Sequence, residues 1–107
     1  VDLGAEWNGL TGLPFVYAMW TGRAGVASAE QSRALLTARE RGEANLEAIA
    51  RGVSGDDPVR EARTLAYLRD NLRYGLGERE AAGLRRFYEL SVEVGVAVAL
   101  KPLRFYS

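Results

Sequence analysis

The sequence predicts a helix-rich piece of an α/β fold, on the basis of three features of the 107-residue chain. Residues 13–20 read LPFVYAMW, an apolar run between turn residues that is typical of a strand buried on both faces. Later segments carry apolar residues at helical spacing, over about residues 28–53, 58–74 and 78–94. The hydrophobic content of 48% is that of a globular chain, so we expect one ordered domain without an internal boundary.

The first expected element is a short helix over about residues 4–10, closed by Thr11 and Gly12. Asp2 stands just ahead of it, where a carboxylate accepts hydrogen bonds from the free amides and suits the helix dipole. We therefore interpret Asp2 as an N-cap.

The predicted strand covers residues 15–20, and alternation places Tyr17 and Trp20 on opposite faces. Both are aromatic residues with a polar tip, which needs a hydrogen-bond partner when it is buried. That partner is either a protein group or a ligand, and core packing is the simpler interpretation.

Ser28 begins the next predicted helix, with Gln31 at capping-box spacing. One apolar stripe follows, formed by Leu35, Ala38, Gly42, Leu46, Ile49 and Val53. Gly42 either marks a break between two helices or allows another backbone to approach closely.

Two further helices have clear boundary signals. Asp57 and Pro58 predict an N-cap and first helical position, and Gly75 offers a C-cap for that helix. The last helix is expected to stop near Gly95. The segment that follows, residues 96–100, reads either as a short strand or as a continuation of the helix.

The amino-acid composition excludes several kinds of catalytic, metal and binding site. The chain has 14 basic and 14 acidic residues, so its net charge of zero gives no sign of a nucleic-acid or anionic membrane partner. It contains no cysteine or histidine, which removes thiolate chemistry and the commonest general base and metal ligand. No apolar segment approaches the roughly 18–20 residues of a membrane span. We expect no catalytic residue, metal or cofactor in this chain.

The run from Asp2 to Trp20 resembles the motif D-L-G-x-x-W-x-x-L-T-G-L-P-F-V-F-A-x-W of the chorismate dehydratases of menaquinone biosynthesis by the futalosine pathway. Residues 67–77, 83–90 and 102–106 resemble later parts of the same family, so the resemblance covers nearly the whole chain. One departure is Tyr17, which stands where Phe is commoner and adds a hydroxyl.

The resemblance implies the C-terminal part of a two-lobed fold like that of type II periplasmic binding proteins. Residues 1–12 would end the second lobe, residues 13–27 would be a hinge-crossing strand and turn, and residues 28–107 would pack as about three helices on the first lobe. The chain begins at Val1 without a Met, and we expect it to be a fragment that needs the missing N-terminal part or self-association.

The implied activity is the dehydration of chorismate to 3-[(1-carboxyvinyl)oxy]benzoate by a cytoplasmic lyase without cofactors. The residues expected to line the substrate cleft and hinge are Asp2, Leu3, Gly4, Phe15, Tyr17 and Trp20. Three alternatives remain: the sister 1,4-dihydroxy-6-naphthoate synthase, a non-enzymatic solute-binding protein of the same fold, and a small helical interaction module.

Overall fold

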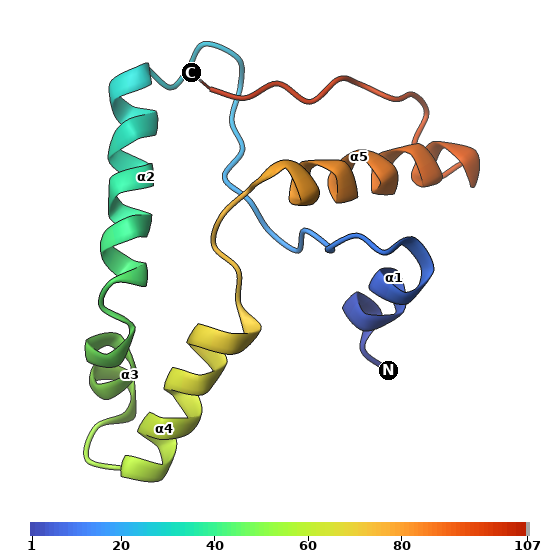
Figure 1. Cartoon of the computed structure of the whole chain (residues 1–107). Coiled ribbons are helices and arrows are strands. Elements are labelled where there is room, and N and C mark those ends of the chain that lie inside the picture. Colours follow the sequence, from blue (N-terminus) through green and yellow to red (C-terminus); the bar gives the residue numbers. More distant parts are fainter. Residues whose placement is uncertain (107) are drawn as a thin grey trace. The chain divides into compact units, whose positions relative to one another are not determined.

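The computed structural model describes residues 1–106 and divides the chain into two compact units. The first unit combines residues 1–24 with residues 76–105, and the second consists of residues 25–75 with Tyr106. The helices are α1 (Leu3–Thr11), α2 (Ala29–Glu43), α3 (Leu46–Ser54), α4 (Pro58–Ala66) with a π-helical turn η1 (Tyr67–Asn71), and α5 (Glu78–Glu93) (Figure 1).

Helix α1 opens the first unit and begins as predicted. The Asp2 Oδ1 atom accepts hydrogen bonds from the amides of Gly4 and Ala5 at 2.9 and 3.2 Å. At the other end Gly12 adopts φ 70°, the left-handed conformation that glycine provides at a helix C-terminus. The predicted cap and the predicted end of this helix are both confirmed.

The strand predicted over residues 15–20 is absent, and residues 1–106 contain no β-strand. This segment is drawn as an irregular ribbon after α1 (Figure 1). A strand exists only when its backbone pairs with a neighbour, and no described segment pairs with this one. The prediction that both faces are buried is also wrong for this structure, since the exposed fractions of Tyr17 and Trp20 are 73% and 86%.

Helix α5 completes the first unit and ends at Glu93, with Gly95 at φ 77°, so the predicted stop is confirmed. At its start the Glu80 carboxylate accepts from the Gly77 amide at 3.0 Å. Residues 96–100 form neither the strand nor the continued helix that the sequence allowed, but turns and irregular chain.

In the second unit, Ser28 and Gln31 form the predicted capping box at the start of α2. The long predicted helix breaks at Ala44 and Asn45, two residues after Gly42. A Cβ added at Gly42 would meet nothing within 4 Å. Of the two alternatives for Gly42, the structure therefore shows a break between two helices close to this residue. No other backbone approaches it closely.

Helices α3 and α4 pack side by side across the turn that precedes Asp57 (Figure 1). Asp57 accepts from the amides of Val59 and Arg60, both at 3.0 Å, and Pro58 takes the first helical position as predicted. The predicted C-cap at Gly75 is wrong, because α4 widens into η1 and ends at Asn71. The Tyr74 hydroxyl instead donates to the Leu68 carbonyl at 3.0 Å.

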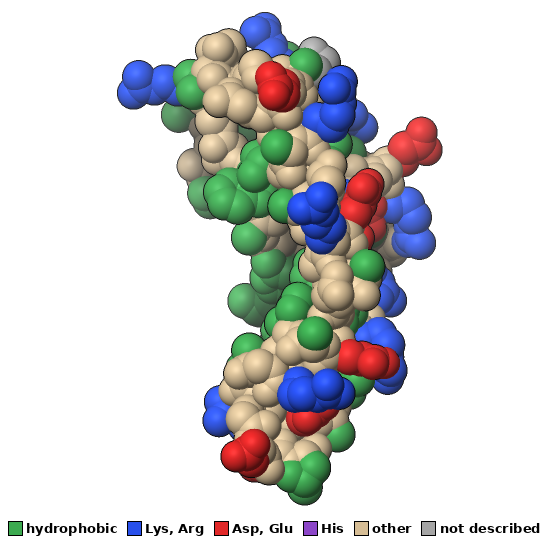
Figure 2. Space-filling model, turned by 90° about the vertical axis from the view of Figure 1, so that its left-hand side faces the viewer, with side chains coloured by type: hydrophobic (Ala, Val, Ile, Leu, Met, Phe, Trp, Pro, Cys, Tyr) green, Lys and Arg blue, Asp and Glu red, His purple; other side chains and the backbone are tan. Residues whose placement is uncertain are grey.

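Few side chains are fully covered. Among the described residues the buried apolar ones are Ala50, Ala81 and Leu84, and α2 has no buried residue. Figure 2 shows apolar side chains at the surface, with acidic and basic side chains interspersed on the visible face.

Across residues 1–106, every helix is too short or too polar to cross a bilayer.

Candidate functional site

The first unit brings four of the six predicted site residues to one place. Phe15 and Tyr17 follow α1 in the chain and their rings meet edge to face, with centroids 4.9 Å apart. The Tyr17 hydroxyl lies over Gly4, where it would collide with any Cβ, and the Asp2 Oδ1 atom lies 3.3 Å from the same Cβ position. Asp2, Gly4, Phe15 and Tyr17 thus form one cluster at the start of α1.

Aromatic packing holds this cluster in place. Trp7 of α1, Phe15 and Phe87 of α5 form a triangle of edge-on contacts with centroid separations of 5.4 to 5.9 Å. Edge-to-face pairs at such distances add roughly 0.5–1.5 kcal/mol each beyond simple burial. The Trp7 Nε1 atom is buried inside this arrangement without a hydrogen-bond partner among the described residues.

Helix α5 also fixes the backbone that leads into the cluster. A guanidinium nitrogen of Arg79 donates to the Gly12 carbonyl at 2.9 Å. One turn later, Gly83 lies against the Pro14 carbonyl so closely that no Cβ fits. Arg79, Gly83 and Phe87 are spaced by four residues, so one face of α5 contacts consecutive parts of residues 12–15.

Two predicted site residues are not part of the cluster. Leu3 is 75% exposed and Trp20 is 86% exposed. Neither side chain forms a ring contact or hydrogen bond with another described residue. Their assignment to a substrate cleft stays a prediction.

Sequence reasoning missed the contributions of Trp7 and of α5. Trp7 belongs to the same motif as the predicted residues, but its role as an aromatic support was not recognised. The spacing of Arg79, Gly83 and Phe87 was an available signal, because residues four apart share a helix face. Which segment that face would contact could not be read from spacing alone.

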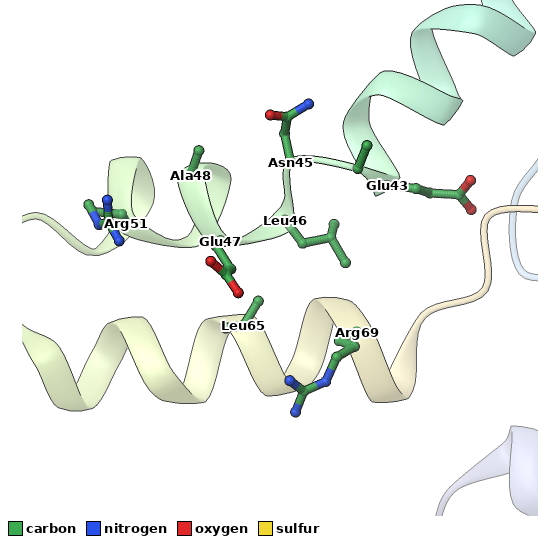
Figure 3. Close-up of a pocket in the computed structure, with 9 residues that line it drawn as sticks. Glu43, Asn45, Leu46, Glu47, Ala48, Arg51, Leu65 and Arg69 are labelled. Carbon is green, nitrogen blue, oxygen red and sulfur yellow. The ribbon is translucent and has the colours of Figure 1, made fainter.

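The second unit has a hollow of about 480 Å³ between the α2–α3 junction and α4 (Figure 3). In the close-up, Leu46 and the Glu47 carboxylate point toward α4 and Leu65, whereas Asn45 points away from it. Its charged lining residues have both signs: Glu43, Glu47, Arg51 and Arg69. Such a lining favours neither an anion nor a cation, so we assign no ligand to it.

The arginines of this hollow already have partners. Arg51 pairs with Glu61 at 3.4 Å, and Arg69 binds both oxygens of Asp70 at 3.0 and 3.3 Å. The hydrogen bond from Arg69 lowers the pKa of the Asp70 carboxyl, and that same bond raises the pKa of Arg69. These exposed pairs stabilise the surface only weakly.

The cluster at the start of α1 combines aromatic and polar groups from Asp2, Gly4, Phe15 and Tyr17. It offers aromatic edges, one phenol and one carboxylate, and it contains no activated nucleophile. Residues 1–106 hold no group of acidic side chains arranged to bind a metal.

Comparisons with known proteins give one result. A family model described as menaquinone biosynthesis matches residues 1–93, which include α1 to α5 and every predicted site residue. No curated protein and no solved structure matches the chain significantly.

Proposed function

The chain belongs to the menaquinone biosynthesis family, and from that membership we propose that it is the C-terminal portion of a chorismate dehydratase. The observation that carries the proposal is the motif over residues 2–20, which resembles that enzyme and lies within the family match. Four of the motif's predicted site residues also cluster in space, around the start of α1.

The proposed reaction removes water from chorismate and leaves 3-[(1-carboxyvinyl)oxy]benzoate. A base takes a ring proton, the electrons of that C–H bond complete the aromatic ring, and the ring hydroxyl departs to form water with a proton. The gain of aromaticity drives the step, so the protein mainly has to orient the substrate and its base. Closure of a cleft would exclude water and strengthen each polar contact.

In this scheme the residues of this chain are wall and hinge residues. Phe15 and Tyr17 would present aromatic surface to the substrate ring, and Asp2 and Gly4 would shape the adjoining backbone. Leu3 and Trp20, which project into solvent here, would complete the wall in the full protein. The base and most substrate contacts would come from the N-terminal part of a two-lobed, periplasmic-binding-protein-like fold.

Two consequences follow from this proposal. The isolated chain should be inactive, because it lacks the proton-abstracting group and most of the substrate contacts that the proposal assigns to the N-terminal part. The full protein should act in the cytoplasm, where we expect its substrate to be made.

The direct test incubates the full-length protein that contains this chain with chorismate and follows the products by mass spectrometry. The expected result is a product lighter than chorismate by one water. Chorismate that is bound but released unchanged would favour a solute-binding protein instead. If chorismate is neither bound nor changed, the dehydratase proposal is wrong, and the sister 1,4-dihydroxy-6-naphthoate synthase or an interaction module becomes the better hypothesis.

A further inference from the structure

Arg79 occupies a position in α5 that local helix preferences disfavour. It is the second residue of the helix, between Glu78 and Glu80, and the partial positive charge of a helix N-terminus repels a cation there. The two acidic neighbours follow the usual preference, whereas Arg79 departs from it. A residue that breaks a local rule commonly does so for a contact elsewhere in the fold.

That contact is with the far end of α1. A guanidinium nitrogen of Arg79 donates to the Gly12 carbonyl at 2.9 Å, although the two residues are 67 positions apart. Gly12 is the C-cap of α1, so this carbonyl lies at the negative end of that helix dipole, where a cation is favoured. The charge that is unfavourable for α5 is thus favourable for α1, and it fixes the point at which the chain enters residues 12–15.

This fixed point determines where Phe15 lies. Residues 13–20 form neither helix nor strand, so individual contacts hold them. The Asn8 side chain donates to the Leu13 carbonyl at 3.2 Å, but this bond lies within α1 and the turn that follows it, so it does not set the distance to α5. The Arg79 bond does set that distance, because it joins the turn to a different helix.

We propose that Arg79 is a positioning residue that holds Phe15 in place for the substrate, a role that rests on the proposed dehydratase function. Arg79 does not touch the substrate in this scheme. It acts through the backbone of residues 12–15, at a carbonyl three residues before the aromatic side chain that would form the wall. Because such a wall binds substrate and transition state alike, its displacement weakens binding and leaves the chemical step unchanged.

The test compares the steady-state kinetics of the full-length protein and its Arg79→Met variant with chorismate. Methionine keeps a long unbranched side chain but removes the charge and the hydrogen-bond donors. The KM should rise about 3- to 10-fold, the effect of one exposed hydrogen bond to a charged group, while kcat changes by less than about twofold. A variant that is merely destabilised behaves in the opposite way, because unfolded molecules lower the apparent kcat and leave KM unchanged.

Two further variants identify the bond and the residue through which it acts. Arg79→Lys keeps a cationic donor, so its KM should lie within about twofold of that of the unaltered protein. In a Phe15→Leu background, Arg79→Met should raise the KM by less than about twofold more, because the ring through which it acts is missing. Arg51→Met is the matched control: Arg51 pairs with Glu61 at 3.4 Å in the other unit, and its loss should change neither constant.

The outcomes separate this inference from the function on which it rests. If the unaltered protein dehydrates chorismate but Arg79→Met lowers only kcat, or changes neither constant, Arg79 does not position the wall. An Arg79→Met effect that is undiminished in the Phe15→Leu background, or that Arg79→Lys reproduces in full, overturns the inference as well. If the unaltered protein does not dehydrate chorismate, both proposals fall.

Discussion

Gly83 of α5 lies directly against the carbonyl oxygen of Pro14, at a separation that leaves no space for a Cβ. The contact joins two positions 69 residues apart in the chain (83 − 14) and sets how closely α5 approaches the segment after α1. Phe87 lies one turn further along α5, and its ring then contacts the ring of Phe15 with the two centroids 5.4 Å apart. The glycine is needed here for close approach, since its φ is not positive.

The first prediction concerns this approach. Gly83→Ala should destabilise the full-length protein by roughly 1–3 kcal/mol, because a backbone carbonyl cannot move aside as a flexible side chain would. Urea unfolding followed by circular dichroism measures the change. Gly42→Ala is the matched control: it also lies inside a helix but has open space around it, and it should stabilise by roughly 0.5–1 kcal/mol. Equal effects of the two variants would contradict the close contact.

The second prediction concerns the Trp7 indole. Its buried N–H has no hydrogen-bond partner within residues 1–106, which costs roughly 1–3 kcal/mol of lost hydration. Trp7→Phe removes this penalty together with part of the ring, so its net cost should be below about 1 kcal/mol. Phe87→Ala removes a partly exposed ring that contacts both Trp7 and Phe15, and it should cost roughly 2 kcal/mol. The same urea titration measures the free energy of unfolding of both variants. A loss of stability for Trp7→Phe that exceeds the loss for Phe87→Ala would mean that the indole N–H does have a partner.

Helix boundaries were predictable from the sequence because their signals are local. Asp2, Ser28 and Asp57 all cap helices as expected, since a side chain reaching an amide two or three residues away depends on little else. Gly75 failed as a C-cap because the chain had already left the helix after η1, a widening that no local signal announced.

The predicted strand shows the opposite case. An apolar run indicates burial, but a strand also needs a partner backbone, and neither the partner nor its position is encoded in residues 13–20. The site was only partly predictable, because a sequence motif identifies residues near one another in the chain but not the distant segment that packs against them. The motif identified Asp2, Gly4, Phe15 and Tyr17, whereas the supporting residues of α5 come from a distant part of the chain.

The third prediction concerns the Asp70 carboxyl, whose pKa lies below the usual aspartate range. The hydrogen bond from Arg69 is the main cause of the lowered pKa. Desolvation opposes it as the next largest effect, and the charges of Arg69 and Arg73 lower the pKa by smaller amounts. Because the folded-state pKa is depressed, the pair stabilises the fold above the pKa of the unfolded chain. That contribution is lost as the pH falls through the folded-state pKa.

Arg69→Gln should therefore raise the pKa of Asp70 toward the ordinary aspartate value, as measured by an NMR titration of its side-chain carbonyl. Arg73→Gln is the matched control and should cause a smaller rise, since Arg73 acts only through its charge. Both side chains of the pair are exposed, so the pH dependence of global stability should barely change. A larger shift from the Arg73 variant would show that charge, and not the hydrogen bond, dominates.

The fourth prediction is that the isolated 107-residue chain does not unfold as a cooperative monomer. A two-state transition requires a core large enough for the parts of a domain to lose structure together. Here the buried apolar residues in the described chain are two alanines and one leucine, Ala50, Ala81 and Leu84. Large apolar side chains such as Leu36 and Trp20 remain 52% and 86% exposed, and surface of this kind favours association.

Differential scanning calorimetry and sedimentation velocity on the isolated chain test this prediction together. We expect a broad or absent heat-absorption peak and a sedimentation coefficient that rises with protein concentration. The caps of α1, α2 and α4 should still support helix formation, so far-ultraviolet circular dichroism should show helix even where calorimetry shows no transition. A sharp transition from a species that sediments as a monomer would show that these helices form a sufficient core without any further segment.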